Sequence, residues 1–209
     1  MDARTAGRRM TELLGLDPPP VAVTFAASAP AGIPRVSRSG PAGCAYWKQA
    51  GEGEVFYTEA ADHFNCPVGS YTHGVTPPPE RAKELEDVVG TMVALRYIRM
   101  DEVDALPRRK AAFGVAVYAP LALTPTPPDV VLVRGRVRQI MLAAEAARAA
   151  GPAGDAAAMG RPACAMIPAM LEGPGGVTSL VGEVVGRLET VLNANRELEK
   201  YHQARRANL

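Results

Sequence analysis

Short apolar runs recur along the chain and are separated by segments rich in proline and glycine. Residues 4–16 carry apolar side chains at roughly helical spacing, which predicts a short amphipathic helix that ends near Gly15. In residues 17–27, three prolines precede a segment in which apolar residues alternate with small or polar ones. This period of two predicts a strand with a rigid proline entry.

The same criteria predict further elements. Alternating or continuous apolar runs predict strands at 53–60, 111–121 and 130–133, and a strand with a glycine bend at 175–187. Helical spacing and strong helix formers predict helices at 44–51, 80–95, 136–151 and 195–209. Strand 130–133 leads directly into a helix, which is an α/β signal. We therefore expect an α/β or α+β fold in which a mixed sheet is flanked by helices.

The length of 209 residues fits a single domain spanning residues 1–209. Two segments, "PPVAVTF" and "PPDVVLV", are both double-proline strand entries, and a cysteine follows each of them after a loop or helix. This similarity suggests two pseudo-repeated halves, about 1–105 and 106–209.

The charge balance restricts the class of partner. With 23 basic and 22 acidic side chains the net charge is +1, so no global field attracts nucleic acid or an anionic membrane. The first sixteen residues lack the apolar core of a secretory signal, and the longest apolar runs fall short of the roughly 20 residues that span a bilayer. We expect a cytoplasmic protein that binds neither nucleic acid nor membrane.

The chemistry-bearing residues are few. The chain has three cysteines, Cys44, Cys66 and Cys164, and the odd number and wide spacing favour reduced thiols over disulfides. The segment "DHFNCPVGSYTHGV" places His63 and His73 on either side of Cys66. It lacks the paired ligands of an ordinary zinc site, although cysteines from separate loops can still meet in a Cys₃ or Cys₃His zinc site.

Three thiolates also suit an iron–sulfur cluster with one iron left open to water, to His63 or His73, or to a substrate. Another hypothesis makes Cys66 a nucleophile with His63 as its base, oriented by Asp62 or Asn65. Packed core cysteines and a polar loop tip at His73 are the simplest alternatives. Dinucleotide, P-loop and hydrolase signatures are missing.

Several landmarks in order resemble the family known as domain of unknown function 169, and they extend from about residue 13 to residue 187. The most specific is the Y-A-P-L…P-D-V-V segment with its following Q-x-M helix, at 118–121, 129–131 and 139–141. The other landmarks are "LLGLDPPPVAVTF", the cysteine at 44, "HFNCPVGSYTHGV", "AC" at 163–164 and "TSLVGEVVGR".

The resemblance implies a role for the cysteines, because family members carry cysteines at the positions matched by Cys44, Cys66 and Cys164. Members also show a late S-L-G-C-x-G-x-R turn, whereas residues 179–187 read S-L-V-G-E-V-V-G-R, without the cysteine. A cluster in this chain would therefore be held by three cysteines, with His63 and His73 as candidates for the fourth position.

Our leading hypothesis is an iron–sulfur protein, of the 4Fe-4S type, with Cys44, Cys66 and Cys164 as ligands. An open iron would suit redox or Lewis-acid chemistry on a small-molecule substrate. The alternatives are a non-catalytic zinc or small-molecule binding module and a cysteine-nucleophile enzyme using Cys66 and His63. We expect a homo-oligomer, because symmetric dimers are the commonest soluble assembly.

Overall fold

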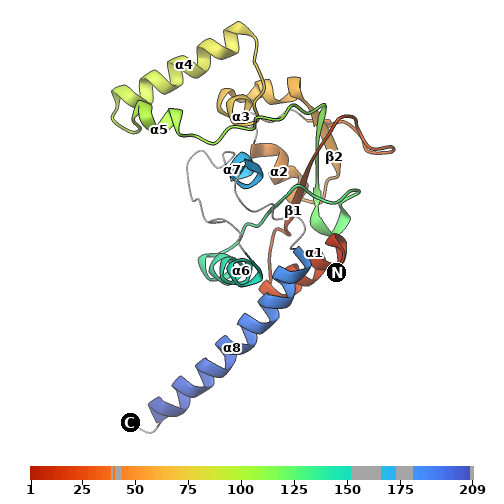
Figure 1. Ribbon diagram of the computed structural model, residues 1–209, viewed down its shortest axis with the longest axis vertical. Helices are drawn as coiled ribbons and strands as arrows, with labels where there is room; N and C mark the ends of the chain where they lie inside the picture. The colour runs from red at the N-terminus through yellow and green to blue at the C-terminus, as the bar shows by residue number, and fades with distance from the viewer. Residues whose placement is uncertain (39, 41–43, 152–165, 173–180, 208–209) are drawn as a thin grey trace.

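The computed structural model describes residues 1–38, 40, 44–151, 166–172 and 181–207 (Figure 1). Its centre is a four-stranded sheet in the order β2-β3-β1-β4. The strands are β1 (Val21–Ala26), β2 (Phe56–Glu59), β3 (Val115–Pro120) and β4 (Val130–Leu132). The three strand pairs are antiparallel. The fold is therefore α+β, one of the two classes that the sequence predicts.

Helices surround this sheet. The α-helices are α1 (Ala3–Leu14), α2 (Cys44–Gly51), α3 (Pro67–Thr72), α4 (Pro79–Ala94), α5 (Met100–Asp104), α6 (Val137–Ala150), α7 (Met166–Glu172) and α8 (Val181–Ala207). Two 3₁₀ segments, η1 (Ala60–Asn65) and η2 (Leu121–Leu123), follow β2 and β3.

The sheet has a hydrophobic cluster on each face. Successive residues of a strand point to opposite faces, and along β1 the side chain of Ala22 joins one cluster while Val21 and Val23 join the other. The Ala22 cluster includes residues of α1, α6 and α8. The other cluster includes residues of α2 and α7. All six residues of β3 are buried, which explains why its sequence is a continuous apolar run.

The predicted helices at 4–16, 44–51, 80–95, 136–151 and 195–209 correspond to α1, α2, α4, α6 and the later part of α8. Gly15 ends α1 in the left-handed conformation at φ 60°, as a C-terminal glycine does. The predicted strand at 175–187 is wrong over 181–187, which belong to α8. Val184, Val185 and Leu188 are buried at helical spacing, so the packing against α1 and α6 decides the conformation. Residues 175–180 lie outside the described part of the chain.

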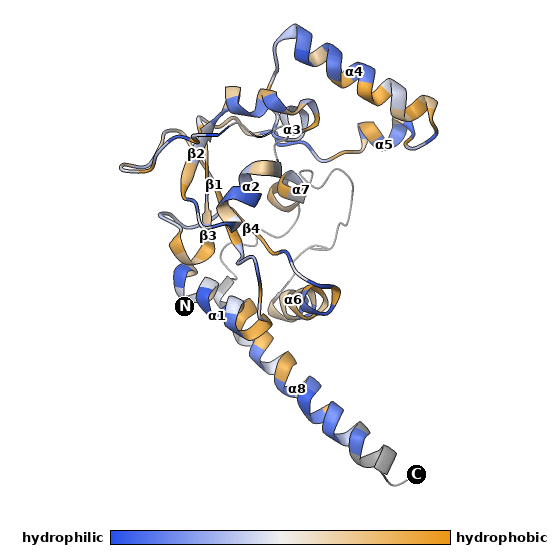
Figure 2. Cartoon of the chain, turned by 180° about the vertical axis from the view of Figure 1, so that it is seen from behind, coloured by the Kyte–Doolittle hydropathy of each residue, from blue (hydrophilic) through white to orange (hydrophobic). Residues whose placement is uncertain are grey.

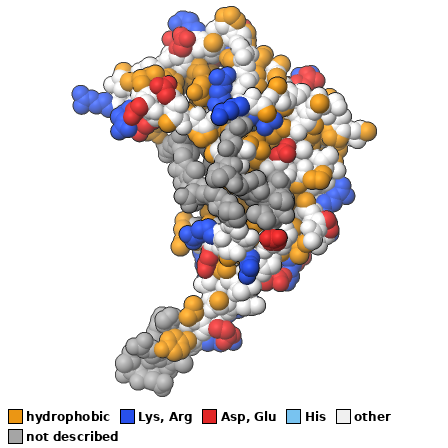
Figure 3. Space-filling model, in the orientation of Figure 1, with side chains coloured by type: hydrophobic (Ala, Val, Ile, Leu, Met, Phe, Trp, Pro, Cys, Tyr) orange, Lys and Arg blue, Asp and Glu red, His pale blue; other side chains and the backbone are white. Residues whose placement is uncertain are grey.

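Two parts extend away from the sheet at opposite ends of the molecule (Figure 1). At one end, α4 and α5 contain no buried residue. At the other end, α8 projects beyond its contacts with α1 and α6, and its later half is mostly hydrophilic (Figure 2). Basic and acidic side chains are interspersed on the face shown in Figure 3, in keeping with the near-zero net charge.

The strands of the two suggested pseudo-repeat halves are interleaved, because β3 lies between β1 and β2, and β1 lies between β3 and β4. A pseudo-repeat is not confirmed by this arrangement. Across the residues that the structure describes, no helix combines the length and the apolar character needed to cross a membrane.

Replacing Gly7 by alanine should destabilise the fold. Gly7 lies in α1 against η2, and an added Cβ would stand 2.7 Å from the Ala122 backbone nitrogen and 2.9 Å from the Leu121 carbonyl carbon. We expect a loss of about 1–3 kcal/mol in the free energy of unfolding, measured by urea denaturation. Gly186→Ala in α8 is the matched control, because nothing lies within 4 Å of its added Cβ. The control should be neutral or stabilising by up to about 1 kcal/mol, and equal losses in both variants would contradict the packing argument.

Candidate functional site

The opening of the "DHFNCPVGSYTHGV" segment forms η1 rather than a loop. The Asp62 carboxylate accepts a hydrogen bond from the Glu59 backbone N–H (2.7 Å) and forms an ion pair with Arg35 (3.0 Å). The Tyr46 hydroxyl of α2 donates to the Asp62 carbonyl. These contacts fix the 3₁₀ turn that carries His63 into the interior.

Cys66 lies at the junction of η1 and α3. It is the N-cap of α3, and its Sγ accepts a hydrogen bond from the Gly69 backbone N–H (3.3 Å). Pro67 occupies the first helical turn, where its missing N–H costs nothing. The Ser70 hydroxyl donates to the His63 carbonyl (2.7 Å) and so ties α3 back to η1. The half-buried thiol of Cys66 is therefore held at a defined helix start.

The short helix α3 brings two histidines together. His73 follows the last residue of α3, and its ring stacks on that of His63 with the centroids 4.4 Å apart and the planes 30° apart. His63 is 0% exposed and His73 is 2% exposed. The sequence interpretation of His73 as a polar loop tip is wrong, because one helix between the two residues folds both rings inward.

Hydrogen bonds assign the tautomer of each ring. His73 Nδ1 is 2.9 Å from the Gly69 carbonyl, which can only accept, so this nitrogen carries the proton. The Thr58 hydroxyl donates to the Ala116 carbonyl (3.3 Å), so it accepts from His63 Nε2 (3.1 Å). The other ring nitrogens, His63 Nδ1 and His73 Nε2, are buried without a hydrogen-bond partner among the described residues. Each presents an unprotonated lone pair.

Both histidines are held neutral. Burial, together with a smaller effect from the charge of a protonated His73, lowers the pKa of His63 to about 3. Burial also lowers the pKa of His73, with a further lowering from Arg109, while the hydrogen bond to the Gly69 carbonyl opposes these effects. The lone pairs are therefore available at neutral pH for a metal or a hydrogen-bond donor.

Arg109 joins the site from the loop before β3. Its backbone N–H donates to the Thr72 carbonyl (2.9 Å). Gly74 has a φ of 71°, and an added Cβ would collide with the Arg109 carbonyl oxygen. The glycine after His73 is thus required for the close approach of the two backbones. This contact places a positive charge beside the histidine pair.

Aromatic rings surround the histidines. Tyr46 of α2 meets the His63 ring edge-on at 5.4 Å, and Phe113 does so at 6.1 Å. Phe25 of β1 lies 6.1 Å from His73 and 5.0 Å from Phe113. Sequence reasoning missed Thr58, Arg109 and both phenylalanines as site residues. The only available signal was the "PRRK" segment before the apolar strand. The residues that meet here come from β1, β2, α2, η1, the end of α3 and the loop before β3.

The structure describes the three cysteines to different extents. Cys66 is fully described, Cys44 is described only as the first residue of α2, and Cys164 lies outside the described residues. Within the described residues, no three His, Cys, Asp or Glu side chains are grouped to hold a metal ion. Over the same residues, neither ring nitrogen of His63 is hydrogen-bonded to Cys66, so the proposed nucleophile and base are not paired.

A family model matches residues 9–173, more than half of the chain, and its family is domain of unknown function 169, described as uncharacterised ArCR. The chain belongs to this family. The match to domain of unknown function 169 covers the histidine pair, Arg109 and the three cysteines. No curated protein and no solved structure matches the chain.

Acid should destabilise this protein through its histidine pair. The unfolded histidines have a pKa near 6.5, whereas the folded pKa of His63 is about 3 and that of His73 is lowered. The unfolded state therefore binds more protons below pH 6.5, and stability falls as pH falls. Each histidine contributes a slope of about 1 kcal/mol per pH unit. Urea denaturation between pH 7 and pH 5 should show this loss.

His73→Asn supplies the control for this slope. It removes one of the two buried imidazoles, so the dependence of the unfolding free energy on pH should become shallower by about one proton. A wild-type protein whose stability does not change between pH 7 and pH 5 would contradict the neutral assignment of the pair.

Proposed function

We propose that this protein binds an iron–sulfur cluster through the thiolates of Cys44, Cys66 and Cys164. The observation that carries the proposal is the packing of α2 against the segment that ends at Cys66. The Asn65 side-chain amide donates to the Tyr46 hydroxyl (3.1 Å) and to the Gly40 carbonyl. The first turn of α2, which begins at Cys44, is therefore tied to the residue that precedes Cys66.

The third cysteine, Cys164, precedes α7 in the sequence. Ile167 of α7 is 1% exposed and packs in the same hydrophobic cluster as Tyr46 and Ala50 of α2. Cys164 is three residues before Ile167 in the sequence, and three residues span at most about 10 Å. The packing of α7 beside α2 supports a site to which Cys164 also contributes.

The donor set suits such a cluster. Thiolates are the usual ligands of iron–sulfur clusters, and the N–H bond from Gly69 to Cys66 Sγ is the kind of interaction that tunes a cluster's potential. The buried lone pairs of His63 and His73 are the described candidates for the fourth position. When bound, a cluster with one open iron would supply redox or Lewis-acid chemistry for a small molecule.

A non-catalytic zinc site remains the second candidate, because a Cys₃His set also suits zinc. The cysteine-nucleophile alternative has no support in the described hydrogen bonding of Cys66. We further propose that the protein is cytoplasmic, where thiols stay reduced, that it acts on a small-molecule substrate, and that it forms a homodimer.

Anaerobically purified protein should be brown and contain iron and acid-labile sulfide. We expect Cys44→Ser, Cys66→Ser and Cys164→Ser each to lose most of the bound iron, because every thiolate supplies one of the few ligands. Metal and sulfide analysis with visible absorption measures this, and circular dichroism checks that each variant is folded. Colourless wild-type protein without iron or sulfide, even after reconstitution, would exclude the cluster. Stoichiometric zinc instead would favour the second candidate.

No more than one histidine should ligate the iron. Lone pairs lie in the ring planes, and the planes of His63 and His73 are stacked 30° apart, so their nitrogens do not converge on one metal. If one histidine binds the iron, electron paramagnetic resonance of the reduced cluster should show coupling to one imidazole nitrogen. That coupling should be lost in only one of the two variants His63→Asn and His73→Asn. If the fourth position is open, the wild type should show no nitrogen coupling. Coupling from two imidazole nitrogens in the wild type would contradict the stacked geometry.

A further inference from the structure

A hydrophobic groove lies between α3 and the helix pair α4–α5, which are side by side in both views (Figure 1, Figure 2). Its volume is about 990 Å³. Val103 and Leu106 line it from the side of α5. From α4, four apolar side chains at helical spacing face the same space: Leu85, Val88, Val89 and Met92. We call this space the α4–α5 groove.

The α4–α5 groove is open along its length. Every residue that lines it is at least partly exposed, and Val88 is 40% exposed. A small-molecule site usually encloses most of its ligand, which this groove does not do. The helix α4 has 16 residues and none of them is buried. A helix of this length is marginal in water unless its apolar face is covered, so the groove fits an elongated partner.

The charge of the groove is negative. Among the described residues that line it, the charged ones are Glu86 and Glu102, and neither forms an ion pair with another described residue. The neighbouring basic side chains are already paired with other carboxylates, as Arg81–Glu84, Lys83–Asp87 and Arg99–Asp101. Charge complementarity therefore favours a basic partner.

A segment with these properties occurs in the same chain. Leu192 is the last residue of α8 that packs in a hydrophobic cluster of the sheet, and residues 193–207 continue the helix for about four turns, roughly 22 Å. We call residues 193–207 the α8 tail. In the sequence the tail has four basic and two acidic residues. Leu198 is 56% exposed and Tyr201 is 59% exposed, and their spacing of three places them on one face.

We propose that the α4–α5 groove of one copy binds the α8 tail of a second copy. Leu198 and Tyr201 contact the apolar side chains of the groove, and the basic residues of the tail lie near Glu86 and Glu102. An amphipathic helix that lays such anchors into a hydrophobic groove is a common mode of recognition.

The proposed contact is between molecules. The groove and the tail lie at opposite ends of the chain, so the tail does not reach its own groove (Figure 1). Two copies side by side in opposite directions make the contact twice, which closes a symmetric dimer. The inference rests on the homodimer of the proposed function and names its interface, whereas it does not require the iron–sulfur cluster.

Sedimentation equilibrium of the full-length protein tests the interface. The wild type should dimerise, and Leu198→Glu and Val88→Lys should each weaken dimerisation by roughly tenfold or more, because each places a charge in an apolar contact. Leu95→Lys and Met141→Glu are the matched controls. Leu95 and Met141 are 74% and 66% exposed, lie outside the tail and do not line the groove, so these variants should dimerise like the wild type. Circular dichroism checks that all four variants are folded.

Mixing the two defective variants tests which surfaces meet. The Leu198→Glu protein keeps an intact groove, and the Val88→Lys protein keeps an intact tail. An equimolar mixture should therefore form a heterodimer through one intact contact, measured by sedimentation velocity with one variant fluorescently labelled. If two grooves or two tails met each other, every mixed pair would contain a defective surface and no heterodimer would form, which would overturn the proposal.

A monomeric wild type, or undiminished dimerisation of both Leu198→Glu and Val88→Lys, would also overturn it. Iron measured on the same samples separates this inference from the cluster. An iron-free protein whose dimerisation follows the variants supports the interface while the cluster fails. An iron-containing wild type that is monomeric does the reverse.

Discussion

The candidate site depends on the burial of two stacked imidazoles. A buried histidine is stable only if it stays neutral and if its N–H finds an acceptor. The Gly69 carbonyl and the Thr58 hydroxyl meet that need on one nitrogen of each ring. The opposite nitrogen of each ring then has its lone pair in the protein interior. The two lone pairs can therefore bind a metal or accept a hydrogen bond, whereas an apolar side chain at the same place would pack without needing any partner.

The neighbouring elements are constrained by the same pair. Thr58 belongs to β2, and its hydroxyl donates a hydrogen bond to the Ala116 carbonyl of β3. The register of these two strands therefore fixes the hydrogen-bond partner of His63. Gly69 belongs to α3, whose start at Cys66 is set by the N-cap bond to the thiol. The position of the cysteine and the orientation of His73 are thus coupled through one short helix. The thiol of Cys66 and the imidazole of His73 would therefore move together in any shift of α3.

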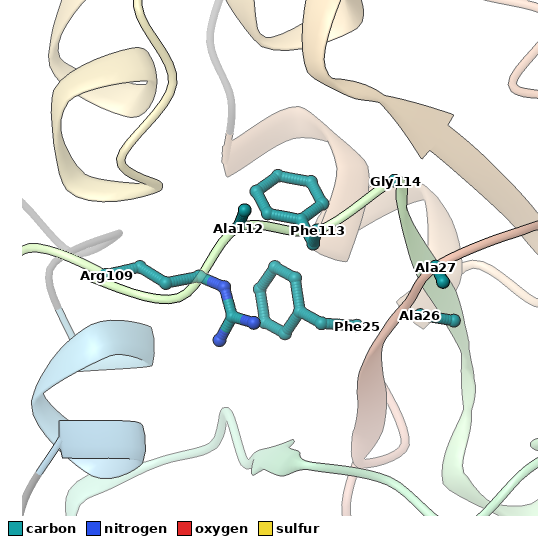
Figure 4. A pocket seen from close by; sticks show the side chains of 7 residues that line it. All are labelled: Phe25, Ala26, Ala27, Arg109, Ala112, Phe113 and Gly114. Atoms are coloured by element: carbon teal, nitrogen blue, oxygen red, sulfur yellow. The ribbon is translucent and has the colours of Figure 1, made fainter.

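The charge of Arg109 and the neutrality of the histidines are complementary. A cation next to His73 disfavours a second positive charge, which helps to keep the imidazole unprotonated. The same guanidinium lies against the ring of Phe25 (Figure 4). The rings of Tyr46, Phe25 and Phe113 pack around the two histidines and contribute to their burial.

The sequence by itself determined much of the fold. Period-two and continuous apolar runs gave β1 to β4, because a strand with one or two buried faces must carry such a pattern. Helical spacing gave α1, α4 and α6 for the same reason. It failed at 181–187, where the two glycines suggested a bend but burial against α1 and α6 held a helix. The order of strands was not readable, since antiparallel pairing between distant segments leaves no local signal.

The sequence also singled out the segment with Cys66, His63 and His73, because those residue types are rare in this chain. Only the tertiary structure decided that the histidines are buried and stacked. It also decided that Thr58, Phe25, Phe113 and Arg109 surround them. Burial and hydrogen bonding depend on which elements meet in space, and neither residue type nor spacing specifies that. Composition therefore indicated where reactive side chains lie, and packing determined their protonation and their neighbours.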